Sequence, residues 1–581
     1  MTFHLDDTAP DKGPFALFCD FLESENVASI LMRPSHSTRR QFILRSAAAF
    51  ALPVTNGSGA AAASPFREKA SFRVLYNNDT TNVTGCVSPF HKAKEPFRPE
   101  MLEASVDEVA NRGVDVHLLQ PGLGMVPMWP SKVLSLPEHY AWVQEHFGVK
   151  PDIFGAYTLK GGDVVKLFVD RCRLRGQAPF ISFRLNDAHN KEFAEAKRGD
   201  KVGGAIGMSV TRFFVEHLDY RIGPDMKHVE AREQNWAIPE VRAQKFALLQ
   251  ELCENYDLDG VELDFLRFYS FFRQDKTTVE ERRGIMTGFV KDVRHLLDRT
   301  ERAGKRRWLC ARIPCYIKAF DPMGLDLPAM VEAGLDMVNV SASYFTVQQS
   351  DLAKIRQLVP NASVYLELCH STWNGPKLIP GYDTFAFRRT TQEQLHTAAH
   401  LAYARGANGV SAFNFAYYRE HGSAGRGPFH EPPFEVFQGL RDPAWLARQP
   451  QHYFLAPGWD NPFVRPALLP RKMEAGKPVS FTLDLAPPAS GWAVGGRLRI
   501  QAATAWGEAE VEASLNGSVL DPTPDVSEPY PNPDPPLLGK AEALRAWQVP
   551  AATLRDGKNE VRFQFKSGPA ASVVFVDLAA G

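Results

Sequence analysis

Short apolar runs that end in polar residues recur between residues 70 and 420. In the run Val261–Phe265 the residues Val261, Leu263 and Phe265 are apolar, and the residues between them, Glu262 and Asp264, are acidic. This period of two is typical of a β-strand. The pattern predicts eight strands: Phe72–Asn77, Val114–Gln120, Ala178–Asn186, Leu258–Arg267, Trp308–Pro314, Asp336–Tyr344, Ser363–Cys369 and Gly409–Tyr417.

Amphipathic stretches with the periodicity of helices separate these runs. Several end in a glycine turn before the next apolar run, as in Arg112–Asp115 and Arg405–Val410. Strands that alternate with helices predict a (β/α)8 barrel; an open doubly wound sheet is the alternative, but no GxGxxG follows the first strand. The predicted helices are Met101–Arg112, Gly162–Arg175, Val241–Tyr256, Gly284–Ala303, Leu327–Ala333, Asp351–Leu358 and Gln392–Arg405.

After Trp445 the helical pattern stops, and short strands separated by proline and glycine turns follow. Strands at this spacing predict a β-sandwich. We therefore expect a barrel domain at 64–450 and a smaller all-β domain at 451–581. The predicted strands are Val479–Leu485, Arg497–Ala503, Glu508–Asn516, Ala546–Val549, Glu560–Lys566 and Ser572–Leu578.

The first 63 residues have a different character. Arg39 and Arg40 precede a mildly apolar run, and Ala60–Ala63 supplies small residues for cleavage. The segment resembles a bacterial twin-arginine export signal, with Met32 as a candidate start. The resemblance implies a protein that folds in the cytoplasm and works in the periplasm or outside the cell.

The composition of the chain excludes some classes of binding partner. Hydrophobic residues make up 44% of the 581-residue chain, charged residues 23%, and the formal net charge is −1. The sequence has no run of basic residues of the kind that binds nucleic acid, and no stretch of about 18 apolar residues that could span a bilayer. Seven cysteines occur without a CxxC pair. We therefore expect no nucleic-acid partner, no membrane span, no bound metal and no cofactor.

Glu262 and Asp264 violate the pattern of a buried strand. Residues two apart lie roughly 7 Å apart on one face, and burying two unpaired carboxylates would cost several kcal/mol. A catalytic pair of acid and base explains such crowding. An ion-paired strand end is the structural alternative.

Further polar residues follow the predicted strand ends, which meet at one mouth in a barrel. Loop aromatics there suit stacking on sugar rings, and the insertion Asp187–Glu240 is long enough for a lid. The polar residues at these strand ends therefore predict that the mouth of the barrel binds a polar ligand. The candidate binding residues are Arg184, Asn186, Asp187, His189, Trp236, Arg267, Arg312, Tyr344, Trp373, Asn414 and Tyr417.

The stretch Asp259–Asp264, together with Glu367 on the seventh strand, resembles bacterial glycoside-hydrolase-like barrels over residues 70–440. In the large retaining clan the acid/base lies at the end of strand 4 and the nucleophile at the end of strand 7. This sequence lacks the Asn-Glu pair of that clan's fourth strand. The resemblance implies an exported enzyme that cleaves an oligo- or polysaccharide.

Glycoside cleavage needs one carboxylic acid and one carboxylate. We predict Asp264 as nucleophile or base, Glu367 as general acid and Glu262 as a deeper orienting residue. Arg184 and Arg312 are expected to keep whichever carboxylate they touch ionised.

Three other classes stay open. A metal-dependent hydrolase would draw on His117, His189 and His370, which form no HxH pair. A sugar-binding protein without activity would keep the aromatics and would not need three lumen carboxylates. A lyase or isomerase would use Tyr344 or His189 as its base.

Overall fold

The computed structural model describes residues 69–80, 83, 85–86, 88–92, 95–123, 125–203, 205–374, 387–419, 430–457, 468–533 and 541–581. The predicted export signal lies outside the described residues. The predicted domain boundaries at 63/64 and 450/451 stay predictions.

Eight parallel strands close into a barrel, as the sequence predicts. Each strand pairs with its neighbour in the chain, and the first strand closes the ring against the last. The fold is a (β/α)8 barrel followed by antiparallel sheets. The barrel strands are β1 (Val74–Asn78), β2 (Val116–Leu119), β3 (Ala178–Arg184), β4 (Gly260–Asp264), β5 (Trp308–Pro314), β6 (Met337–Ser341), β7 (Ser363–Cys369) and β10 (Gly409–Phe413).

The lower lumen of the barrel is apolar. Leu75, Leu118, Phe180 and Tyr365 belong to one buried cluster there. Gly260 begins β4 without a side chain because the ring of Phe180 occupies that place: a Cβ on Gly260 would lie 2.4 Å from it. Asp264, Arg312 and Glu367 lie further along their strands, toward the carboxyl ends.

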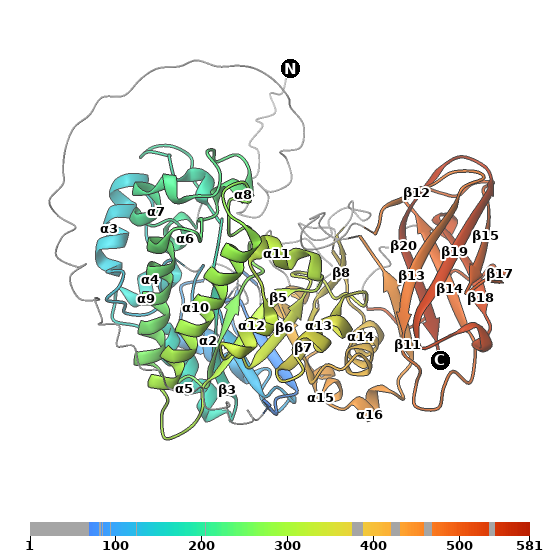
Figure 1. Ribbon diagram of the computed structural model, residues 1–581, viewed down its shortest axis with the longest axis horizontal. Coiled ribbons are helices and arrows are strands. Elements are labelled where there is room, and N and C mark those ends of the chain that lie inside the picture. The colour runs from blue at the N-terminus through green and yellow to red at the C-terminus, as the bar shows by residue number, and fades with distance from the viewer. Residues whose placement is uncertain are drawn as a thin grey trace, which may run out of the picture. The chain divides into compact units, whose positions relative to one another are not determined.

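Helices cover the outside of the barrel, and Figure 1 shows α9 and α10 running along it. The predicted helices are present with shifted ends. The longest, α10, begins at Val279 because Thr278 and Glu281 form a capping box there. The helices that follow the barrel strands are α2 (Pro99–Asp107), α5 (Val164–Leu174), α9 (Pro239–Asn255), α10 (Val279–Arg299), α11 (Phe320–Met323), α12 (Leu327–Glu332), α13 (Leu352–Leu358), α14 (Gln392–Ala404), α15 (Val436–Leu440) and α16 (Pro443–Leu446).

Two long connections at the mouth pack on each other. The loop after β2 carries α3 (Leu136–Phe147) and α4 (Ile153–Thr158), and Val143 and Phe147 share an apolar cluster with Ile206 of the insertion after β3. The helices α3, α6 and α7 lie together in Figure 1. The predicted lid is thus a folded layer. Its elements are η2 (Lys191–Phe193), α6 (Ile206–Ser209), α7 (Arg212–Glu216), η3 (Leu218–Tyr220) and α8 (Val229–Arg232).

A short antiparallel pair, which the sequence does not predict, follows β7 at the mouth. Its strands are β8 (Ser371–Asn374) and β9 (Phe387–Arg389). Ser371 of β8 donates its hydroxyl to the carbonyl oxygen of Tyr344 at 2.8 Å. The side chain of Trp373, a predicted sugar-stacking residue, lies outside what the structure describes.

The C-terminal part holds two antiparallel sheets around one apolar core. Phe481 and Phe563 of one sheet and Trp547 and Leu578 of the other belong to that core, the arrangement of a sandwich. One sheet is built from β11 (Gln451–Leu455), β12 (Arg471–Met473), β14 (Gly496–Ala502), β17 (Asp521–Thr523), β18 (Leu544–Val549) and β20 (Ala571–Ala580), the other from β13 (Pro478–Leu485), β15 (Glu510–Leu515), β16 (Ser518–Val519) and β19 (Gly557–Ser567).

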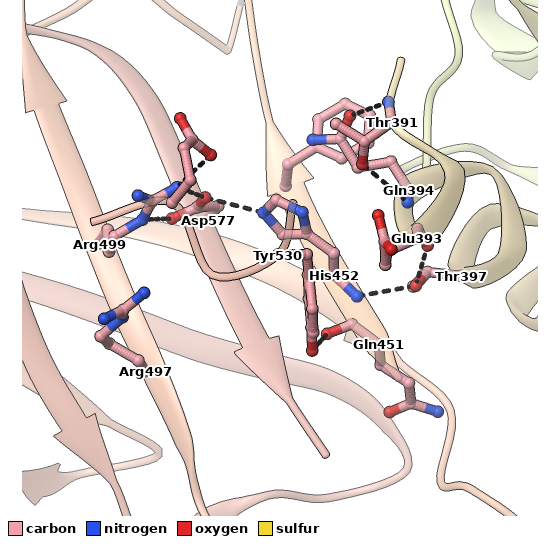
Figure 2. Close-up of polar contacts among 12 residues, drawn as sticks. Thr391, Glu393, Gln394, Thr397, Gln451, His452, Arg497, Arg499, Tyr530 and Asp577 are labelled. Carbon is pink, nitrogen blue, oxygen red and sulfur yellow. Dashed lines mark hydrogen bonds and ion pairs between the residues drawn. The ribbon is translucent and has the colours of Figure 1, made fainter. Parts of the chain in front are cut away.

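A buried polar network joins the barrel to β11 (Figure 2). The backbone N–H of His452 donates to the hydroxyl of Thr397 on α14 at 2.7 Å, and its Nε2 lies 2.8 Å from Asp577. Asp577 also accepts two hydrogen bonds from Arg499, at 3.0 and 2.6 Å. Burial would raise the pKa of Asp577, but Arg499 and His452 hold it below its usual range. Among the described residues, no helix is long and apolar enough to cross a membrane.

Candidate active site

Arg312 of β5 lies at the centre of the upper lumen. Its Nε and Nη2 donate to the two carboxyl oxygens of Glu367 at 2.7 and 2.6 Å, and its Nη1 donates to Oδ1 of Asp264 at 3.0 Å. The ring of Phe413 covers the guanidinium, 4.4 Å from its carbon. Burial would lower the pKa of Arg312, but the two carboxylates raise it well above its usual value. One permanent cation therefore binds both predicted catalytic carboxylates.

The two carboxylates differ in how many donors they receive. Glu367 accepts the two bonds from Arg312, a third from the Ser341 hydroxyl at 2.5 Å and a fourth from Asn339 at 3.3 Å. Asp264 accepts one bond from Arg312 and one from the Leu266 backbone N–H at 2.9 Å, both on Oδ1. Its Oδ2 is buried and has no hydrogen-bond partner among the described residues. Glu367 is therefore the more fully hydrogen-bonded of the two carboxyl groups.

Glu262 lies one layer deeper. Its Oε1 accepts from Ser182 at 2.7 Å and Asn77 at 3.2 Å, and its Oε2 accepts from Asn339 at 3.0 Å. Burial, with a smaller contribution from Asp264, raises the pKa of Glu262 to about 7. Because Asn339 also contacts Glu367, Glu262 connects to the upper carboxylates through a shared amide.

A second group of polar residues lies at the ends of β3 and β4. Asp187 accepts from Arg184 at 3.2 Å and contacts Nδ1 of His189 at 2.9 Å. Nε2 of His189 lies 2.7 Å from Nη2 of Arg267. Arginine only donates, so Nε2 accepts and Nδ1–H donates to Asp187. Burial lowers the pKa of His189 to about 4, which keeps the imidazole neutral near pH 7.

Aromatic rings continue from Arg267 across the mouth. Its guanidinium carbon lies 5.1 Å from the ring centroid of Tyr344, and Tyr344 stacks on Tyr417 with centroids 6.5 Å apart. The hydroxyl of Tyr417 contacts Asp79 at 3.5 Å. Ser343, which precedes Tyr344, has a positive φ of 63°, an uncommon conformation that concentrates at functional sites.

Two predicted binding residues have structural roles instead. Trp236 is fully buried, with Phe271 and Phe289 at centroid distances of 5.6 and 5.0 Å. Asn186 donates to the backbone carbonyls of Gln234 and Ser270 at 3.0 and 2.9 Å. Both residues fasten the insertion to the barrel.

Asn414 ends β10 in the left-handed conformation, with φ 55°. It is buried, and within the described part of the chain neither its side-chain oxygen nor its side-chain nitrogen has a hydrogen-bond partner. A buried amide without partners is uncommon. This position therefore remains a candidate for contact with a ligand.

The histidines named for a metal site do not come together. His117 faces away from the lumen, between Tyr76 and Phe168 at centroid distances of 5.0 and 5.2 Å, and burial lowers its pKa to about 3. His370 lies beside Tyr417 at 5.2 Å, and His189 is held by Asp187. Among the described residues, no cluster of three metal-ligating side chains is present.

Ser182, Asn339 and Phe413 line the lumen but are not among the site residues predicted from the sequence. All three lie on barrel strands, and Asn339 and Ser182 share a lumen face with Ser341 and Arg184, two residues further along their strands. Counting back two residues from Ser341 and Arg184 along their strands would have identified Asn339 and Ser182. Nothing in the local pattern indicates that Phe413 covers a guanidinium.

No protein-family model and no curated protein matches this chain. Solved glycoside hydrolases resemble it in structure at low identity. An endo-β-1,4-mannanase from Thermotoga petrophila has a TM-score of 0.41 and 10% identity, covering 87% of this chain and 98% of its own.

The endoglycoceramidase II of Rhodococcus sp. has a TM-score of 0.35 and 13% identity, covering 86% of this chain and 97% of its own. A maltogenic α-amylase from Thermotoga neapolitana has a TM-score of 0.34 and 11% identity, over 87% and 99%. The assignment of chemistry therefore rests on the side chains of the site.

Proposed function

We propose that the protein hydrolyses glycosidic bonds at the mouth of its barrel, with Glu367 and Asp264 as the reacting carboxylates. The observation that carries the proposal is the shared guanidinium of Arg312, which contacts both groups. Two carboxyl groups in different surroundings can divide the roles of acid and base. Glycoside hydrolysis requires that division.

The hydrogen-bond donors around the two carboxyl groups favour exchanging the roles predicted from the sequence for Glu367 and Asp264. Glu367 receives four hydrogen bonds and acts as the ionised carboxylate that attacks the anomeric carbon or activates water. Asp264 has one oxygen without a hydrogen-bond partner among the residues that the structure describes, and in this proposal that oxygen carries the proton for the leaving group. Glu262 sets the orientation of Asn339 from below.

The lyase alternative needs a free base at the mouth. Burial raises the pKa of Tyr344, so its phenol stays protonated. Nε2 of His189 already accepts from Arg267, and its pKa of about 4 makes it a weak base. Both candidate bases are therefore poorly suited to proton abstraction, which supports hydrolysis.

A panel of chromogenic glycosides and plant or algal polysaccharides tests the proposal. The full-length protein and Glu367→Gln are assayed side by side for reducing ends. Release by the first and not by the second supports hydrolysis at this site. Binding without release, in every member of the panel, would instead support a sugar-binding protein.

A further inference from the structure

Arg267 follows Asp264 by three residues and is held at the mouth on three sides. Its guanidinium carbon lies 5.1 Å from the ring centroid of Tyr344 and 5.3 Å from that of Phe268. Nη2 donates to Nε2 of His189 at 2.7 Å. These contacts fix the position of a cation before any ligand arrives.

The other two arginines of the site are neutralised by contact. Arg312 binds Glu367 and Asp264, and Arg184 binds Asp187 at 3.2 Å. In the part of the chain that the structure describes, Arg267 has no carboxylate within ion-pair distance, and its single hydrogen bond goes to a neutral imidazole. The charge of Arg267 therefore lacks a contact anion.

The nearest acids cannot readily supply that anion. Asp187 already binds Arg184 and His189, and through its side chain it accepts the backbone N–H of His189 at 2.8 Å. Asp79 contacts the hydroxyl of Tyr417. Both acids act on Arg267 only at longer range.

Donors of Arg267 are also unused. Its Nε is buried without a hydrogen-bond partner, and no hydrogen bond from Nη1 is present among the described residues. A partly buried cation without a counter-ion is costly, and a guanidinium with free donors suits a planar or tetrahedral anion. The stacked rings leave only the edge of the group for that contact.

We propose that the mouth selects acidic glycans: a sugar ring whose anionic substituent, a carboxylate or a sulfate, pairs with Arg267. This inference rests on the proposed function, because it takes carbohydrate as the ligand of the mouth. It explains why a charged residue stands beside the ring of Tyr344, where a neutral sugar would need only a hydrogen-bonding amide. The alternative is a structural cation that only fixes Tyr344.

Calorimetric titration of the full-length Asp264→Asn protein tests this inference, because the variant is expected to cleave natural glycans slowly and keeps the paired Arg312–Glu367 contact. The ligands are trisaccharides of galacturonate or glucuronate, the matching neutral hexoses, and 6-sulfated hexoses. An acidic member should bind at least about tenfold tighter than its neutral partner, and added salt should weaken that preference. The uronate and sulfate arms identify the substituent.

A second substitution assigns the preference to one residue. Adding Arg267→Gln should abolish the preference, and Arg267→Lys, which keeps the charge, should retain part of it. Equal affinity for acidic and neutral partners, or a preference that survives Arg267→Gln, would overturn the inference. Hydrolysis of neutral glycosides by the wild type without acid preference would leave the proposed function standing. Tight binding of acidic ligands by the wild type, with no turnover of any of them, would overturn the proposed function alone.

Discussion

Arg312 binds Glu367 through two parallel hydrogen bonds, Nε to Oε2 at 2.7 Å and Nη2 to Oε1 at 2.6 Å. A bidentate pair of this kind is strong and directional. Asp264 shares the same guanidinium through a single bond. This asymmetry is the physical basis for assigning Glu367 as the anion and Asp264 as the acid.

Glu367→Gln should abolish turnover on every substrate, by about three orders of magnitude or more. The amide of Gln cannot accept both hydrogen bonds from Arg312, but Arg312 keeps its contact with Asp264. We therefore expect the free energy of unfolding to fall by about 1–3 kcal/mol. Initial rates and urea unfolding measure the two effects. The exposed Glu332→Gln on α12 is the matched control and should change neither. A Glu367→Gln protein with wild-type turnover would remove this residue from the mechanism.

Glu262 should make stability fall as the pH rises. Burial raises its pKa from 4.5 to about 7, so between these values the folded chain holds a proton that the unfolded chain has released. The free energy of unfolding attributable to Glu262 therefore declines by at most about 1.4 kcal/mol per pH unit across this window. The contribution is fully present below pH 4.5.

Glu262→Gln removes that titration. Urea unfolding at several pH values between 4.5 and 7 should give a flatter curve for the variant than for the wild type. Glu108, whose pKa burial also raises to about 7, remains in both proteins and cancels in the difference. Parallel curves would show that Glu262 is ionised throughout the window.

Asp577→Asn should destabilise the joint between α14 and β11. The change leaves Arg499 and His452 buried beside a neutral amide, which costs about 3–5 kcal/mol for a broken buried pair. Asp521→Asn, at an exposed position in the same sheet, should stay within about 0.5 kcal/mol of the wild type. Urea midpoints measure both, and equal effects would contradict the buried-pair account.

Export should depend on the arginine pair of the leader. Replacing Arg39 and Arg40 by lysine should leave the protein in the cytoplasm of a bacterial host. Fractionation and immunoblotting measure the distribution, with Arg33→Lys as the control outside the pair. Unchanged yield in the periplasm would contradict the twin-arginine interpretation.

The barrel could be predicted because each strand is a short apolar run with polar residues at its end. Helix ends were harder: α10 begins five residues before the predicted Gly284, since the Thr278–Glu281 capping box outweighs the apolar pattern. The pair β8 and β9 was missed because Phe387–Arg389 is too short and too charged to read as a strand.

The carboxylates of the site could be predicted, but their surroundings could not. Glu262, Asp264 and Glu367 break the apolar pattern on their strands, which is a local signal. The division of Arg312 between Glu367 and Asp264 depends on side chains from three strands. Trp236 resembled a sugar platform in the sequence, and only the fold shows that Phe271 and Phe289 enclose it.

The dependence of Asp264→Asn on the leaving group tests the central claim most directly. A general acid is essential when the departing alcohol is a poor leaving group and dispensable when the leaving group is a good one, such as dinitrophenolate. The account predicts that Asp264→Asn loses about 10²–10⁴-fold in kcat/KM on natural glycans and little on dinitrophenyl glycosides, whereas Glu367→Gln is inactive on both. Equal losses on both kinds of substrate in Asp264→Asn, or recovery of Glu367→Gln on the dinitrophenyl glycoside, would contradict it.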